Sequence, residues 1–161
     1  MPLRPISEHS TGELQNLVRN HRDRGATSAP RYLEAFEELG RRRGQGFVFD
    51  RSLTLIRQAA VERRFMSYKE LADAHGLEWS RVHYAINTHL GDLIEYAHLK
   101  GIPLLSAIVV NQKNVATGEM EPSTLRGFAN AARELGYEFE DDAVFMREQQ
   151  EAVFQWASAS R

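Results

Sequence analysis

The chain has 161 residues, 42% of them hydrophobic and 26% charged, a length and balance typical of one globular domain with its own core. It contains no cysteine, which excludes disulfides, thiolate metal sites and cysteine nucleophiles. No apolar run approaches the roughly 18 residues of a membrane helix. The N-terminus shows no signal-peptide apolar region, so we expect a cytoplasmic protein without a membrane partner.

The net charge of −2 is unevenly spread along the chain. Residues 1–81 hold 14 Lys and Arg against 11 Asp and Glu, whereas residues 82–161 hold 6 against 11. The first half is therefore +3 and the second −5. Such asymmetry can mark a side that binds a polyanion, and a plainly solvated surface is the alternative.

Two helices are predicted after a loose N-terminal tail. Ser10 and Glu13 have the spacing of a capping box, and the helix they begin should end at Gly25. Residues 27–30 open a second helix, because a proline in the first turn loses no hydrogen bond. The glycines of residues 44–46 end it.

Three more helices are predicted in the middle of the chain. Asp50 can cap the first. Residues 67–75 form a short helix that starts with a second capping-box pattern and ends at Gly76. A longer helix begins at Trp79 and Ser80 and ends near residue 100. The predicted buried stripe of this longer helix is Val82, Ala85, Ile86, Leu90, Leu93 and Ala97.

A different pattern follows in the last third of the chain. Residues 104–110 are almost all apolar and rich in β-branched side chains, which predicts a buried strand. Residues 111–118 form a polar loop, and a return strand over 115–121 is left open. Two further helices are predicted, one capped by Ser123 and one beginning near Asp142.

The predicted fold class is mostly α with a minor β element, built as a helix-turn-helix or winged-helix-like core with flanking helices. Its parts are an N-terminal helical segment (1–49), a winged-helix-like unit (50–121) and a C-terminal helical pair (122–161). We expect these parts to form one compact domain.

The two helices around Gly76 have the order of a helix-turn-helix, whose second helix presents its first residues to base edges. Arg81 and Asn87 suit bidentate contacts with guanine and adenine. Tyr68 and Lys69 begin the first helix, where phosphate contacts are expected. The predicted nucleic-acid-binding residues, including two in a wing, are Arg63, Arg64, Tyr68, Lys69, Ser80, Arg81, His83, Tyr84, Asn87, Asn111 and Lys113.

A family resemblance covers about residues 53–120. The chain is similar there to the winged-helix domain of DNA alkyltransferases and alkyltransferase-like proteins. The matching positions are Ser67-Tyr-Lys-Glu-Leu-Ala72, Gly76, Val82, Ala85, Ile102-Pro103 and Ile108-Val-Val110. The resemblance implies a helix-turn-helix, then a strand and a wing, with DNA as the partner.

The chain departs from this family at the residues that carry its chemistry. Where the family has Pro-Cys-His-Arg, this chain has Leu, Leu and Ser after Pro103, so alkyl transfer is not expected. The arginine that opens the duplex in the family falls on Ser80, one position before Arg81. The whole chain also resembles a bacterial family, and that resemblance carries no function.

The sequence supports metal binding and catalysis less well than nucleic-acid binding. His83, His89 and His98 are spaced too widely on one helix to meet at one metal ion. The carboxylates of residues 138–142 suit a helix-capping loop better than a divalent-ion or acid–base site. Ser106 lies in an apolar run without a nucleophile elbow. We predict no catalytic residue, no metal and no cofactor, and lean away from an enzyme.

The sequence thus favours a non-catalytic DNA-binding protein with a regulatory, repair or defence-accessory role. Duplex DNA is the favoured partner, and a homodimer is considered. The alternative is a protein-interaction module, such as a phage-defence, phage or mobile-element accessory, that uses the same helices on a protein partner. A further interpretation also remains open: the two helices around Gly76 are an ordinary helix pair, and the predicted wing is a plain surface turn.

Overall fold

A computed structural model describes residues 4–43, 46–83 and 85–159. This part of the chain is mostly helical with one small parallel sheet, which confirms the predicted mostly-α class with a minor β element. The strands are β1 (Met66–Ser67) and β2 (Val109–Val110), and the 3-10 turns are η1 (Ile6–Glu8), η2 (Leu105–Ile108) and η3 (Gln112–Asn114). The helices are α1 (Thr11–Asp23), α2 (Pro30–Arg43), α3 (Phe49–Val61), α4 (Tyr68–Ala74), α5 (Trp79–Val82), α6 (Ile86–Lys100), α7 (Pro122–Glu134) and α8 (Asp142–Ala159).

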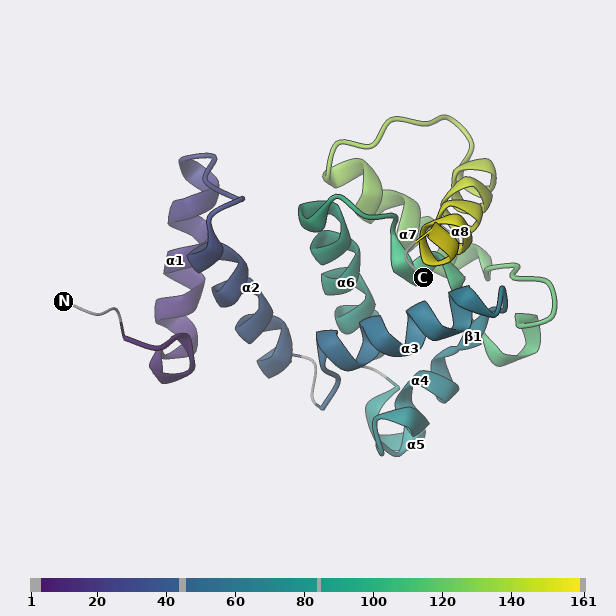
Figure 1. The fold of residues 1–161 in the computed structure, drawn as a ribbon, viewed down its shortest axis with the longest axis horizontal. Coiled ribbons are helices and arrows are strands. Elements are labelled where there is room, and N and C mark those ends of the chain that lie inside the picture. The colour runs from purple at the N-terminus through teal and green to yellow at the C-terminus, as the bar shows by residue number, and fades with distance from the viewer. Residues whose placement is uncertain (1–3, 44–45, 84, 160–161) are drawn as a thin grey trace.

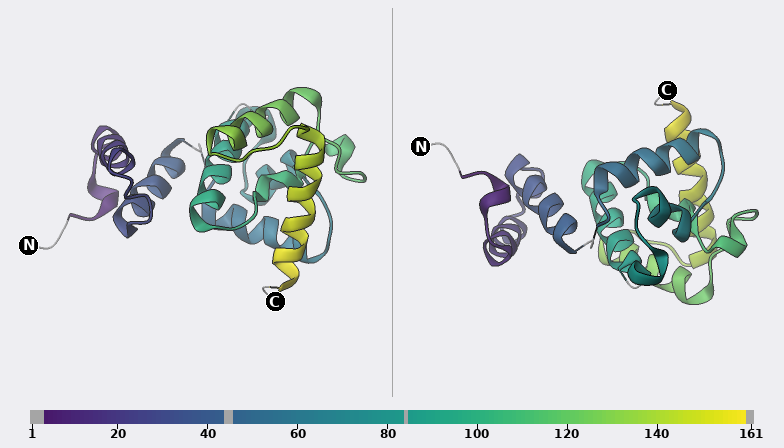
Figure 2. Two further views of the ribbon diagram at one scale, coloured as in Figure 1. Left: turned by 90° about the horizontal axis from the view of Figure 1, so that it is seen from above. Right: turned by 90° about the horizontal axis from the view of Figure 1, so that it is seen from below.

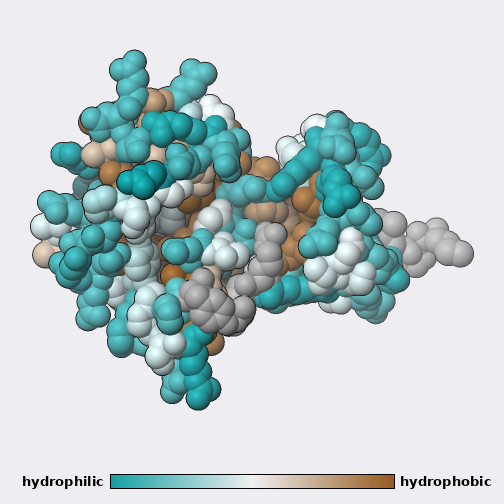
Figure 3. Space-filling model, turned by 180° about the vertical axis from the view of Figure 1, so that it is seen from behind, coloured by the Kyte–Doolittle hydropathy of each residue, from teal (hydrophilic) through white to brown (hydrophobic). Residues whose placement is uncertain are grey.

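Helices α1 and α2 form a hairpin to one side of a larger body that holds the other elements (Figures 1 and 2). Leu14 and Tyr32 are buried within the hairpin. Leu99 of α6 packs against both the hairpin and the body, and Arg22 of α1 forms an ion pair with Glu95 of α6. The molecule narrows at this join, as the view from behind shows (Figure 3). Within the described ranges, no helix is both long and apolar enough to cross a membrane.

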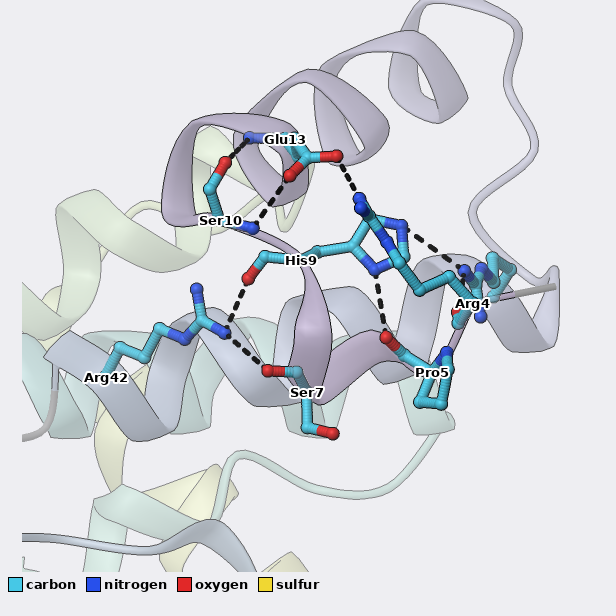
Figure 4. Close-up of polar contacts among 8 residues, drawn as sticks. Arg4, Pro5, Ser7, His9, Ser10, Glu13 and Arg42 are labelled. Carbon is cyan, nitrogen blue, oxygen red and sulfur yellow. Dashed lines mark hydrogen bonds and ion pairs between the residues drawn. The ribbon is translucent and has the colours of Figure 1, made fainter.

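The start of the chain is tied to the hairpin by polar contacts (Figure 4). The predicted capping box is confirmed, because Ser10 Oγ accepts the Glu13 N–H at 3.1 Å and Glu13 Oε1 accepts the Ser10 N–H at 3.0 Å. Arg42 of α2 donates to the carbonyl oxygens of His9 (2.8 Å) and Ser7 (3.4 Å). These bonds fix η1 and the first turn of α1 against α2.

The predicted strand over residues 104–110 is wrong over most of its length. The segment is completely buried, as expected, but Leu105–Ile108 is a 3-10 turn and only Val109–Val110 is a strand. That strand pairs in parallel with β1, in the register Met66 with Val109 and Ser67 with Val110. Residues 115–121 form turns and irregular chain rather than a return strand.

The predicted long helix from Trp79 to Lys100 is split in two. α5 ends at Val82 and α6 begins at Ile86, and the intervening Tyr84 lies outside the described residues. The buried stripe is confirmed on both sides of the break, from Val82 through Leu93. Tryptophan, serine, valine and histidine all have modest helix propensity, so little local preference holds residues 79–83 in one helix with α6.

Side-chain amides of α8 supply partners to the buried segment. Gln150 is 6% exposed, and its Nε2 donates to the carbonyl oxygens of Ala107 (3.0 Å) and Gly118 (2.9 Å). Gln149 Oε1 accepts the backbone N–H of Leu104 at 3.0 Å. Helix α8 therefore satisfies backbone groups that a strand ladder would otherwise have paired.

We predict that Gln150→Leu lowers the free energy of unfolding by about 2–4 kcal/mol, because two carbonyl groups lose their donor. Urea unfolding of the purified chain measures the change. Gln155→Leu, an exposed position on the same helix, is the matched control and should shift stability by less than about 0.5 kcal/mol. Equal effects of the two substitutions would contradict a special role for Gln150.

His89 of α6 is buried as a neutral side chain. It is 0% exposed, its Nε2 lies 2.7 Å from Ser52 Oγ, and its ring stacks on Phe47 with centroids 4.9 Å apart. Burial lowers the pKa of His89 from 6.5 to about 3, and the nearby His75 adds to the effect. The folded protein therefore resists protonation at a site that the unfolded chain protonates readily.

This difference predicts an acid-sensitive fold. The unfolded histidine takes up a proton below about pH 6.5 and the folded one only near pH 3, so stability is lost as pH falls between these values. From pH 6.5 to 5.0 the loss should be about 1.5 kcal/mol. Urea unfolding of the wild type and His89→Leu at both pH values tests this. An unchanged pH dependence in the variant would assign the loss to other groups.

Candidate functional site

The β1–β2 pairing brings two of the predicted nucleic-acid-binding groups together. Ser67 pairs with Val110, so the start of α4 lies beside the start of the predicted wing. Tyr68 and Lys69 therefore neighbour Asn111, although they are about forty residues apart in the chain. An open depression here is lined by side chains from both segments, including Arg64, Lys69 and Gln112.

A second group surrounds the short helix α5. Ser80, Arg81 and His83 are exposed around it, and Asn87 is exposed on the first turn of α6. We call these four residues the α5 face. The predicted neighbour Tyr84 lies outside the described residues.

Trp79 connects the α5 face to the start of α4. Its ring stacks on Tyr68, with centroids 6.5 Å apart and planes 15° apart, and lies 6.0 Å from the ring of His83. The half-buried indole therefore holds α5 against Tyr68. Sequence reasoning missed this role, although a tryptophan at the first turn of the predicted helix was a visible signal.

Every described cation predicted for nucleic-acid binding has a carboxylate partner. The N–O distances lie between 2.6 and 3.0 Å. The pairs are exposed or half-buried, and exposed pairs are typically worth only about 0–1 kcal/mol, so a stronger anion can displace the carboxylates. The pairs are Arg63 with Glu151, Arg64 with Glu62 and Glu70, Lys69 with Asp73, Arg81 with Glu78, and Lys113 with Glu121.

Arg63 is the one of these cations that turns toward α8. Its guanidinium contacts both carboxylate oxygens of Glu151 and lies 5.1 Å from the ring centroid of Phe154. Its backbone is in the left-handed region, with φ of 53°. The structure therefore gives Arg63 a packing partner on α8, while Arg64, the next residue, lines the depression beside α4.

A cavity of about 370 Å³ lies between α6, α7 and the buried segment 104–110. Tyr68 and Asn87, two of the predicted binding residues, line it together with Ser106. Sequence reasoning considered Ser106 only as a nucleophile and did not find the cavity. Two helix-interior glycines, Gly91 and Gly127, also line it and were the available signal.

The polar groups considered for metal or acid–base chemistry are dispersed or engaged. In the part of the chain that the structure describes, no three His, Asp or Glu side chains gather as metal ligands. Asp141 caps α8, its Oδ1 accepting the Val144 N–H at 3.0 Å, and Asp142 pairs with Arg133 at 2.7 Å. The acidic stretch therefore has the helix-capping role.

No protein-family model, curated protein or solved structure matches this chain.

Proposed function

We propose that the protein is a non-catalytic nucleic-acid-binding protein, with duplex DNA as its ligand. The observation that carries the proposal is the α5 face, where polar side chains suited to base edges project beside the start of α4. In this proposal α4, the turn at Gly76 and α5–α6 act as a helix-turn-helix, and η3 takes the place of a wing. The proposal includes a cytoplasmic location and a homodimer on paired half-sites.

The proposed roles follow the chemistry of the side chains. Arg81 and Asn87 would contact base edges, since a guanidinium and a carboxamide can each make paired hydrogen bonds to a purine. Arg64, Lys69 and Lys113 would contact phosphates on either side of the groove. Each phosphate contact requires a cation to leave its carboxylate, so we expect modest affinity that falls steeply with salt.

A second candidate function is the binding of a protein partner by the same face. The mixed charge of that face favours it. Arg81 lies beside Glu78 and Lys69 beside Asp73, an alternation that complements another mixed-charge protein surface. A partner of this kind would bind without preferring polyanions. The same titration therefore separates the two candidates.

We predict that the wild type binds mixed-sequence duplex DNA at about 25 mM KCl and that binding weakens with salt, with a log–log slope of about −0.9 per phosphate contacted. Lys69→Ala should reduce the slope by about one contact, because it removes one phosphate-binding cation. Fluorescence polarisation measures both. Arg19→Ala, an exposed cation on α1, is the control and should leave the slope unchanged.

Arg81→Ala should act differently, because a base contact discriminates between sequences. On the duplex selected as the best binder from a random pool, we expect about 5- to 100-fold weaker binding, with a smaller loss on mixed sequence. If the wild type shows no salt-sensitive binding to DNA at low ionic strength, the nucleic-acid proposal is wrong and the protein-partner candidate replaces it.

A further inference from the structure

The cavity between α6 and α7 has uncharged walls. Every residue that lines it is neutral, and its apolar part includes Leu90 and Ile94 of α6 and Phe128 of α7. At about 370 Å³, it falls within the size range of small-ligand sites. A charged molecule would lose its hydration there without gaining an opposite charge, so the lining favours a neutral occupant.

Two buried hydroxyl groups belong to residues that line this cavity, and that of Ser106 has no hydrogen-bond partner among the described residues. Ser106 is 4% exposed, and its Oγ is unpaired. The Tyr68 hydroxyl is also buried, and Thr124 is its polar neighbour. An unsatisfied buried polar group destabilises the fold, and a ligand that accepts its hydrogen bond would recover that loss.

Two exposed glycines, Gly91 and Gly127, line the cavity. A Cβ atom built on Gly91 of α6 or on Gly127 of α7 would meet no atom within 4 Å. Each is inside a helix, where glycine is less favourable than alanine. Each position therefore has room for a larger side chain at the edge of the cavity.

We propose that this cavity binds a small uncharged molecule with an apolar body and a hydrogen-bond acceptor, the acceptor facing Ser106 and Tyr68. The hydroxyl of Tyr68 is a donor at neutral pH, since the ordinary tyrosine pKa is 10.0 and burial raises the pKa of Tyr68 further. This site adjoins the base contacts proposed above, because Asn87 belongs to both. It does not depend on DNA binding.

Three small molecules that share a phenyl ring test the proposal. Each is titrated into the ¹⁵N-labelled full chain, and binding is followed by the shifts of the amide NMR signals. Benzamide is neutral and carries an acceptor, benzoate is charged, and ethylbenzene has no hydrogen-bonding group. We expect benzamide to bind with a dissociation constant of about 1 mM, ethylbenzene more weakly, and benzoate not detectably. The shifts should centre on residues 87–94, 106–109 and 124–131.

Two variants test whether the probes bind in this cavity. Ser106→Ala removes a donor and should weaken benzamide about 3- to 10-fold while leaving ethylbenzene unchanged. Gly127→Leu fills the space and should abolish binding of both, and its better helix propensity favours a folded variant. Gly12→Leu, at an exposed helix position far from the cavity, is the matched control and should bind like the wild type.

Several results of these titrations would contradict the proposal. Absence of benzamide binding, equal binding of benzoate, or shifts centred elsewhere would each overturn the proposal. So would full binding by Gly127→Leu. If that variant does not fold, the contrast between benzamide and ethylbenzene in Ser106→Ala decides the matter, and an equal loss for both probes counts against the site. DNA titrations of the same samples distinguish this result from failure of the proposed function.

Discussion

The structure depends on keeping the whole segment Leu104–Val110 out of water. All seven residues are buried, and each brings a backbone N–H and C=O that must be paired. A two-residue ladder with β1 pairs only its end. The 3-10 turn η2 and the two glutamines of α8 supply other partners, so α8 is a hydrogen-bonding element of the core as well as an apolar one.

The way in which the backbone of this segment is paired determines where the candidate sites lie. Because only Val109–Val110 pairs with β1, the register brings the start of α4 beside η3 and so assembles the proposed phosphate contacts. Because the preceding residues turn instead of extending, Ser106 lines the α6–α7 cavity without a hydrogen-bond partner among the described residues. The conformation of the segment Leu104–Val110 thus underlies both the proposed nucleic-acid surface and the proposed ligand site.

Sequence patterns predicted several of the features that are decided locally. The caps expected at Asp50 and Ser123 were wrong, because Val48 and Glu121 hold the N-cap positions of α3 and α7. The Ser10–Glu13 capping box, the helix end near residue 100 and the buried stripe from Val82 to Leu93 each depend on residues within one or two turns. The 3-10 turn and the cavity were not predictable in this way, because they depend on partners such as Gln150 and α7 that lie far along the chain. The ion pairs Arg63–Glu151 and Lys113–Glu121 join distant residues too, and they change the electrostatics of the predicted site.

The central claim is that nucleic acid is bound by the start of α4, the α5 face and η3 together. The most direct test is a map of amide NMR shifts while duplex DNA is titrated into the full chain at low salt. The account predicts that the shifts concentrate in residues 64–69, 79–87 and 111–113, with the α1–α2 hairpin unaffected, and that they reverse when salt is added. Shifts confined to the hairpin, or no shifts at all, would contradict it.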